Sequence, residues 1–364
     1  MTRLVSLVDG CFRASLRRLL LFKRTGNPRQ RVAGFAFRLR PVRQDTAVPT
    51  SYSLVYLRNG ARSIRSLAEA ETFHPVIGPA IEAEALYVRQ LRLPERVEAT
   101  SGEFVIWDVG LGAAANALTA IRLIRGSLHG KPAQLRLVSF DHTSAASAFA
   151  LEHGAELGYV AGYEFALAEL IKNHSAKFSD ESLQVEWTLE LGDFPAWLKS
   201  RAGVSPAQQT FHCEQEIAEA ASLLPGAGRR DACPTLPPPH AILFDPFSPK
   251  KNPAMWTVPL FADLFRRLDP QRPCALANYT RSTMARVTML LGGFFVGVGH
   301  PSGLKEETTV AANRPELLDE PLDRSWLARA KSSHGAEPLN GLVYRQAPLS
   351  PETWERLRQH PQFH

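Results

Sequence analysis

The fold is decided by residues 103–124, which read Glu103-Phe-Val-Ile-Trp-Asp-Val-Gly-Leu-Gly-Ala-Ala-Ala-Asn-Ala-Leu-Thr-Ala-Ile-Arg-Leu-Ile124. The first seven residues are a short apolar run rich in β-branched and aromatic side chains, which is typical of a buried strand. Two glycines end this run, and helix-favouring residues follow from Ala113 onward. The stretch therefore predicts a strand, a tight turn and a helix.

The same alternation continues toward the C-terminus. Helical patterns cover residues 113–124, 143–153, 162–173 and 258–268. Seven strands interleaved with helices predict an α/β fold with a Rossmann-like, doubly wound sheet. The seven strand candidates are residues 103–109, 135–141, 184–191, 241–244, 274–278, 294–298 and 308–312.

This pattern divides the chain into segments. We expect the Rossmann-like domain to span residues 98–313, with a surface insertion at 205–239 that ends in a Pro-rich stretch. The remaining predicted segments are a basic N-terminal arm at 1–47, a lead-in that covers the site at 48–97, and a polar C-terminal tail at 314–364.

The net charge of +6 is unevenly distributed. Residues 1–50 contain eleven Arg or Lys against two Asp, which gives +9 and leaves −3 for the rest of the chain. Clustered arginines attract nucleic-acid phosphates, because binding releases counterions. The alternatives are a poorly ordered leader or a segment that mimics a transit peptide.

Cysteine usage and hydropathy indicate the compartment. The four cysteines form no Cys-x-x-Cys pair, so we expect reduced thiols and a cytoplasmic protein. No apolar run approaches the roughly 20 residues that span a bilayer, so no membrane association is expected. The spacing of His212, Cys213, Cys233 and His240 fits no familiar zinc site, and no metal is expected.

The glycines after the first core strand indicate a ligand site. Gly110 and Gly112, which open the site together with Asp108, let the chain turn sharply and let a ligand approach the backbone. Ala114 stands where a dinucleotide-binding loop has its third glycine, and Asp141 lies 31 residues beyond Gly110 rather than roughly 20. Both departures disfavour a nicotinamide dehydrogenase and favour S-adenosylmethionine, which has no phosphate.

Carboxylates follow the next two strands. Asp141 is placed to hold the ribose hydroxyls of an adenosyl group, because a carboxylate only accepts hydrogen bonds. Asp193 is placed to accept from the adenine amine. The alternative for each is a helix cap or a turn former. Their joint position at strand ends predicts a class I S-adenosylmethionine-dependent methyltransferase.

The segment Phe244-Asp-Pro-Phe-Ser-Pro249 follows the fourth core strand. Its carboxylate, Asp245, would lie at the carboxyl edge of the sheet, where open α/β proteins bind ligands. There it could orient a substrate amine toward a methyl group, with a proline-fixed carbonyl as a second acceptor. The alternative is a Pro-rich turn before the following helix, with Trp256 merely buried.

The run Phe244-Asp-Pro-Phe-Ser-Pro-Lys-Lys-Asn-Pro-Ala-Met-Trp256 resembles the Asp-x-Phe-x-Pro…Asn-Pro-x-Met-Trp signature of the MnmC-like methyltransferases, which include stand-alone MnmD-type proteins. The donor loop from Asp108 to Asn116 also resembles that family's Gly-Phe-Gly-x-Gly-x-Asn loop. Glu71-Thr-Phe-His-Pro-Val-Ile-Gly-Pro-Ala-Ile-Glu-Ala83 is similar to the segment that leads into the fold of stand-alone members. The resemblance covers about residues 50–313.

The resemblance implies methyl transfer to the aminomethyl nitrogen of wobble 5-aminomethyl-2-thiouridine in tRNA, presented from the anticodon loop. It implies that Asp245 orients or deprotonates the amine. Phe247, Asn252 and Trp256 are the implied substrate residues. The implied donor residues are Asp108, Gly110, Gly112, Asn116, Asp141 and Asp193.

Two other functions remain open from the sequence. A methyltransferase for a different amine would share these motifs, and the −3 charge outside the arm favours a substrate other than RNA. A non-catalytic RNA-binding protein that retains the fold would explain the missing third glycine. Donor binding without tRNA methylation would indicate the first, and tRNA binding without donor binding the second.

Overall fold

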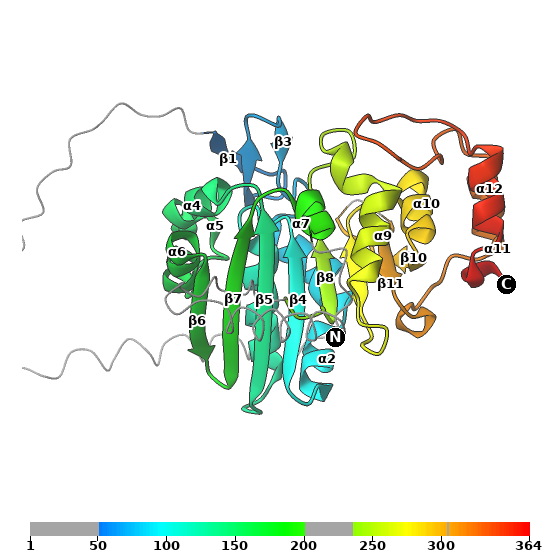
Figure 1. Ribbon diagram of the computed structural model, residues 1–364. Coiled ribbons are helices and arrows are strands. Elements are labelled where there is room, and N and C mark those ends of the chain that lie inside the picture. The colour runs from blue at the N-terminus through cyan, green and yellow to red at the C-terminus, as the bar shows by residue number, and fades with distance from the viewer. Residues whose placement is uncertain (1–50, 201–235, 304–305) are drawn as a thin grey trace, which may run out of the picture. The chain divides into compact units, whose positions relative to one another are not determined.

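The computed structural model describes residues 51–200, 236–303 and 306–364. The predicted arm at 1–47 and most of the predicted insertion at 205–239 lie outside these ranges. The folded unit that begins at Thr50 is built on an eight-stranded sheet in the order β10-β11-β9-β8-β4-β5-β7-β6 (Figure 1). Its strands are β4 Glu103–Val109, β5 Ala133–Asp141, β6 Ser175–Asp180, β7 Leu183–Leu191, β8 Ala241–Phe244, β9 Ala275–Asn278, β10 Phe295–Gly299 and β11 Thr308–Ala312.

Five neighbouring strands of this sheet, β7, β5, β4, β8 and β9, are parallel. The chain runs outward from β4 through β5 to β7 and then returns to the other side of β4 as β8. The strand order therefore reverses beside β4, and open α/β sheets bind ligands at the carboxyl ends of the strands at such a point. This topology confirms the Rossmann-like α/β fold predicted from the sequence.

The sheet has one strand more than the seven predicted. The extra strand, β6, pairs antiparallel with β7 at the edge of the sheet. Its sequence Ser-Ala-Lys-Phe-Ser-Asp buries only Ala176 fully, so it lacks the apolar run that identifies the central strands. An edge strand with one solvated face gives a weak hydrophobic signal.

Alternate residues of β4 pack into different apolar layers. Phe104 and Ile106 join the cluster that contains α3, whereas Val105 and Trp107 join the cluster that contains α9. Burial on both faces explains why this strand reads as a continuous apolar run. The helices of the core are α2 Leu93–Ala99, α3 Ala115–Ser127, α4 Ala145–Glu152, α5 Gly154–Leu157, α6 Glu164–Asn173, α7 Phe194–Ser200, the 3-10 turn η2 Pro253–Trp256, α9 Val258–Arg266 and α10 Thr283–Leu291.

The segment before the core forms a small antiparallel sheet. In Figure 1 this sheet lies beyond the ends to which the arrows of β4 and β5 point. An aromatic contact connects this sheet with the core. The ring centroids of Tyr52 and of Phe149 in α4 are 6.0 Å apart. The elements of this segment are β1 Tyr52–Tyr56, β2 Arg62–Ser66, β3 Glu71–Thr72, α1 Pro79–Ala83 and the π-helix η1 Glu84–Arg89.

The C-terminal segment is more structured than a polar tail. Trp326, Leu357 and Phe363 are buried in the cluster that also contains α9 and α10. Within the described ranges, no helix is long and apolar enough to cross a membrane. The elements of this segment are the 3-10 turn η3 Pro315–Leu317, α11 Arg324–Lys331, α12 Pro351–Arg358 and the 3-10 turn η4 Pro361–Phe363.

Candidate functional site

The predicted donor loop forms a sharp turn between β4 and α3. Gly110 and Gly112 have φ angles of +98° and +50°, which side chains rarely allow. Ala114, in place of a third glycine, also has a left-handed backbone with φ of 62°. The N–H of Gly110 donates to the Phe140 carbonyl at 2.9 Å, which holds the turn against the end of β5.

Asp141 lies at the end of β5 beside this loop. One carboxylate oxygen accepts from the N–H of Gly112 at 2.8 Å, and the other accepts from Thr143 at 3.3 Å. Burial raises the pKa of Asp141 above its ordinary value, and the hydrogen bond from Gly112 opposes this shift. A carboxylate has about four acceptor positions, so these bonds leave room for a hydroxyl of a ligand.

Asp108 lies beneath the loop and is fully buried. Its Oδ2 accepts from the Ser139 hydroxyl at 2.8 Å, and burial raises the pKa of this carboxyl to about 7. In the part of the chain that the structure describes, Asp108 Oδ1 and Asn116 Oδ1 are buried without a hydrogen-bond partner. Such orphaned acceptors are costly unless a ligand or water satisfies them.

Asp245 follows β8 and meets the donor loop directly. Its Oδ2 accepts from the Asn116 amide at 2.8 Å. A Cβ added to Gly110 would lie 2.6 Å from the backbone oxygen of Asp245, so the two loops touch at a point where only glycine fits. The structure thus brings the predicted donor residues Gly110 and Asn116 together with the predicted catalytic carboxylate.

Three side chains hold the carbonyls that flank Asp245. Asn278 donates to the Phe244 carbonyl at 2.9 Å, and the Tyr279 hydroxyl donates to the Pro246 carbonyl at 3.0 Å. The proline-fixed carbonyl that the sequence suggested as an acceptor for a substrate amine is therefore already engaged. The indole of Trp256 donates to the Phe247 carbonyl at 2.9 Å.

Trp256 itself is fully buried in the core. This burial is at odds with the predicted contact between Trp256 and a substrate base, because an indole with no exposed surface cannot line an open pocket. The residue instead supports the loop that carries Asp245. Phe247 is only partly buried, and its ring lies 5.8 Å from that of Phe73.

The two remaining predicted residues lie at local turns. Asp193 is exposed and accepts at 3.0 Å from the N–H of Ala196, in the first turn of α7. The carbonyl of Asn252 accepts from the N–H of Met255 in η2. Asp193 thus has the capping role that its side chain usually has, whereas only the backbone of Asn252 takes part in its turn, and the predicted ligand contacts of both residues stay predictions.

The sequence assigned no role to several residues that surround Asp245. His74 Nε2 lies 3.8 Å from Asp245 Oδ2, and Glu71 accepts from the Ser248 hydroxyl at 2.7 Å. Burial, followed by the charge of Asp245, raises the pKa of Tyr87 well above its ordinary value, so its phenol stays neutral. Burial, followed by the charge of Asp245, also raises the pKa of Tyr279 well above its ordinary value. The sequence signal for Glu71 and His74 was the Glu71–Ala83 motif, in which neither residue was assigned a chemical role.

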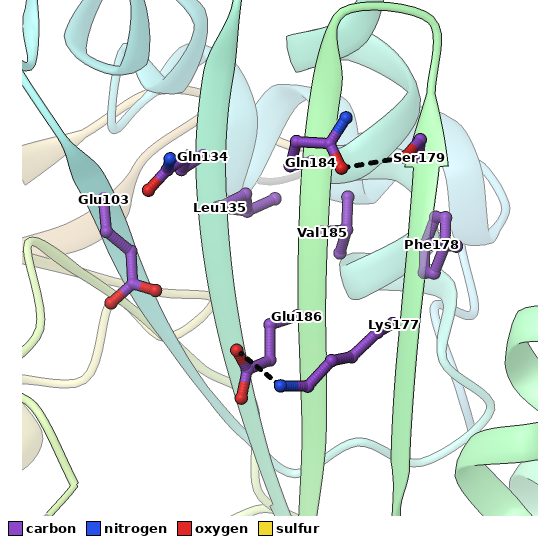
Figure 2. A pocket seen from close by; sticks show the side chains of 9 residues that line it. All are labelled: Glu103, Gln134, Leu135, Lys177, Phe178, Ser179, Gln184, Val185 and Glu186. Carbon is purple, nitrogen blue, oxygen red and sulfur yellow. Dashed lines mark hydrogen bonds and ion pairs between the residues drawn. The ribbon is translucent and has the colours of Figure 1, made fainter.

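A separate depression of about 370 Å³ lies at the opposite edge of the sheet (Figure 2). Glu103 and Gln134, near the amino ends of β4 and β5, contribute to its lining. Lys177 and Glu186 pair across it at 3.2 Å. Because β4 advances roughly 3.3 Å per residue, its amino end lies on the order of 20 Å from the donor loop. This depression is therefore not part of the site around Asp245.

Comparison with known proteins agrees with this geometry. Residues 215–314 match the model of a family described as S-adenosyl-L-methionine-dependent methyltransferase. This range includes β8, Asp245 and the strands up to β11. No curated protein sequence gives a significant match.

Among solved structures, the chain is similar to MNMC2 from Aquifex aeolicus. The TM-score is 0.54 with 17% sequence identity, over 85% of this chain and 84% of that one. A SAM dependent methyltransferase from Agrobacterium tumefaciens matches with a TM-score of 0.34 and 12% identity, over 74% of this chain and 71% of the other. At these identities the Aquifex structure supports the fold, and the second match adds no argument.

Proposed function

We propose that this chain methylates an amine nitrogen held at Asp245. The premise is that the chain is an S-adenosyl-L-methionine-dependent methyltransferase of the MnmC-like family. The substrate that we propose is the aminomethyl group of wobble 5-aminomethyl-2-thiouridine in tRNA. The observation that carries the proposal is the direct contact between the donor loop at Gly110 and the backbone of Asp245.

The residues present fit the methyl donor. The turn at Gly110 and Gly112 leaves space that a Cβ would fill, and Asp141 presents acceptor oxygens to a ribose. When bound, S-adenosylmethionine supplies a methyl group on a positively charged sulfur. The carboxylates of Asp141 and Asp245 suit this charge, because opposite charges attract strongly in a partly buried site.

Asp245 has the chemistry that an amine substrate requires. Attack on a methyl group needs a nitrogen with a free electron pair, directed along the methyl–sulfur axis. The carboxylate accepts a hydrogen bond or a proton from the amine, and the Asn116 amide fixes its orientation through the 2.8 Å bond to Oδ2. Asp245 is the residue on which methyl transfer should depend most.

Two observations support tRNA as the source of the amine. The run from Phe244 to Trp256 resembles the signature of enzymes that act on the wobble uridine. The bases of an anticodon loop are unstacked enough to enter a pocket without melting a duplex. The ring pair of Phe73 and Phe247, beside the donor loop, offers an apolar surface for such a base.

The test measures transfer of labelled methyl from S-adenosylmethionine to tRNA that bears 5-aminomethyl-2-thiouridine. We expect label at the wobble base with the parent protein. Asp245→Ala should lower kcat/KM by roughly 100-fold or more, the usual contribution of a general base, with little change in donor affinity. Asp319→Asn, an exposed carboxylate that pairs with Arg92, is the control and should retain activity.

Donor binding without transfer to this tRNA would contradict the proposed substrate. The folded unit from Thr50 onward carries the −3 charge noted above, which favours a small cationic amine as the second candidate. Transfer of label to such an amine, again dependent on Asp245, would then establish the alternative. Binding of tRNA without binding of the donor would indicate a non-catalytic protein.

A further inference from the structure

His74 lies between the buried carboxylate of Glu82 and the partly exposed carboxylate of Asp245. Its Nε2 is 3.8 Å from Asp245 Oδ2, and its Nδ1 is 3.9 Å from Glu82 Oε2. The side chains of His74, Glu82 and Asp245 are 10%, 7% and 19% exposed, so solvent screens this array less than it screens surface charges. The imidazole of His74 therefore lies between Asp245, which is beside the donor loop, and Glu82, which is farther from that loop.

The backbone holds His74 in this position at a cost in free energy. His74 has a φ of 47°, in the left-handed region that a residue with a side chain rarely adopts. The strand before it is anchored by the N–H of Phe73, which donates to the Ile64 carbonyl at 2.8 Å. Strained residues of this kind persist where the surrounding structure fixes them, and they concentrate at functional sites.

Glu82 is positioned by the turn that starts α1. Gly78 has a φ of 95°, and a Cβ there would lie 2.9 Å from that of Ala61. The N–H of Glu82 donates to the Gly78 carbonyl at 3.0 Å, so the side chain leaves the first turn of the helix toward His74. One segment of 13 residues, Glu71–Ala83, thus carries both members of the array.

The groups around His74 are acidic or neutral. Glu82 and Asp245 face its two nitrogens. Tyr87 and Tyr279 lie near Asp245, and burial raises the pKa of both phenols well above the ordinary value. Glu71 lies near Tyr279. In this setting an imidazolium would be stabilised by two carboxylates, while the phenols would not compete for the proton at neutral pH.

An amine substrate presents a proton problem. An alkylamine is protonated at neutral pH and has no electron pair for the methyl group. Asp245 alone is a weak base, and a proton left on it would remove the charge that holds the substrate. A second acceptor behind Asp245 solves this problem.

We propose that His74 acts through Asp245 as a positioning residue that relays the proton away from the substrate amine, with Glu82 holding the imidazole and balancing its charge. This inference rests on the proposed function, because it requires an amine substrate. On this inference, the residues behind Asp245 come from the segment before the Rossmann-like core.

The step balances as follows. The substrate ammonium gives a proton to the Asp245 carboxylate, which passes it to Nε2 of the neutral His74, and imidazolium results. The freed electron pair on nitrogen forms the bond to the methyl carbon. The bond from that carbon to sulfur breaks, and its electrons remain on sulfur as a neutral thioether. The methylated product is an ammonium ion, and His74 later returns its proton to water.

The kinetic test compares His74→Gln and Glu82→Gln with matched controls. His129→Gln changes a histidine with the same φ of 47° at an exposed loop, and Glu84→Gln changes a carboxylate two residues beyond Glu82. With labelled donor and aminomethyl-bearing tRNA, we expect His74→Gln to lower kcat/KM at pH 7 by roughly 10- to 100-fold. The donor KM should change less than about twofold, and the controls should behave as the parent.

The pH profile separates a relay from a packing role. Without His74 the enzyme depends on amine that is already neutral in solution, so the loss in His74→Gln should shrink as the pH rises from the His74 midpoint to pH 9. A packing defect would give the same loss at every pH and a lower unfolding temperature. A constant loss, or no loss, would overturn the proposal.

A second measurement does not need the substrate. In NMR titrations of the histidine rings, with the His74 signal assigned by its absence in His74→Gln, the His74 midpoint should fall by roughly one pH unit or more in Glu82→Gln and in Asp245→Asn. It should be unchanged in Glu84→Gln. A His74 midpoint that moves in neither variant would contradict the coupling of His74 to the two carboxylates, even if tRNA is methylated. A midpoint that moves as expected, without methylation of tRNA, would contradict only the proposed substrate.

Discussion

Gly110 is the residue at which the predicted donor loop meets the loop that carries Asp245. The backbone oxygen of Asp245 occupies the position next to the missing side chain, and the φ of +98° is itself unsuited to other residues. The contact fixes the distance between the donor loop and the carboxylate more tightly than either loop could alone. On the proposed function, Gly110 therefore affects the position of the substrate amine as well as that of the donor.

Gly110→Ala should disrupt both functions. The added methyl must displace the Asp245 carbonyl from 2.6 Å while adopting a strained backbone, which we expect to cost at least about 2 kcal/mol of unfolding free energy. Donor affinity, measured by calorimetry, should fall at least tenfold. Gly126→Ala is the control, because it is exposed in helix α3 with open space around it and should raise stability by up to about 1 kcal/mol. Full donor affinity in Gly110→Ala would refute the contact.

At the scale of elements, the C-terminal segment completes the edge of the sheet. The Gln362 side chain accepts from the Val296 N–H at 2.7 Å and donates to the carbonyls of Val296 and Leu322 at 2.7 and 2.8 Å. It thereby imitates a neighbouring strand for β10. An edge strand with unpaired backbone groups would otherwise invite pairing with another chain.

Gln362→Ala should leave the buried N–H of Val296 in β10 without its partner, while the Val296 carbonyl keeps its bond from the Leu322 N–H. We expect a loss of about 1–3 kcal/mol in unfolding free energy, measured by chemical denaturation, and a tendency to self-associate. Gln359→Ala, at the exposed C-cap position after α12, removes only a side-chain bond to Glu355 and should stay within about 0.5 kcal/mol of the parent. Equal stability of the two variants would show that water replaces Gln362.

Elements also differ in how well the sequence predicts them. The central strands β4, β5 and β8 are buried on both faces and read as apolar runs, so they were identified directly. Strand β6 was missed because its side chains are mostly solvated. The short strands β1 to β3 lie in a lead-in segment that gave no clear period, although they carry the turn that places His74.

At the scale of the whole molecule, positive charge is concentrated in the first 50 residues, with +9 there and −3 elsewhere. The site is acidic as well, which suits a sulfonium donor and an amine but not a polyanion. If tRNA is the substrate, we expect the arm, or positive charge clustered locally in the folded unit, to provide affinity for RNA.

This division of charge predicts the effect of neutralising the arm. Changing Arg13, Arg17, Arg18, Lys23 and Arg24 to Gln lowers the net charge from +6 to +1. Affinity for tRNA should fall, and the dependence of log Kd on log salt should weaken by roughly 0.7–0.9 per lost phosphate contact, with donor affinity unchanged.

The matched control removes five positive charges from the C-terminal segment and should leave affinity for tRNA closer to the parent value. Equal weakening by the two sets would show that net charge matters and the arm does not. The control positions are Arg329, Lys331, Arg345, Arg356 and Arg358.

The sequence by itself determined the α/β fold and the methyl donor, and it singled out Asp245 as the proposed catalytic residue. These features depend on local patterns, namely apolar runs, a glycine turn and a motif of 13 residues. Local patterns can be recognised without knowledge of the tertiary structure. Only the tertiary structure decided which residues contact Asp245 directly. Asn116 and His74 lie 129 and 171 positions before it in the chain, and the parallel sheet and the lead-in turn bring them within 4 Å. The tertiary structure also placed Trp256 in the core rather than in a pocket, since packing density, which a linear motif does not encode, sets which aromatic side chains stay accessible.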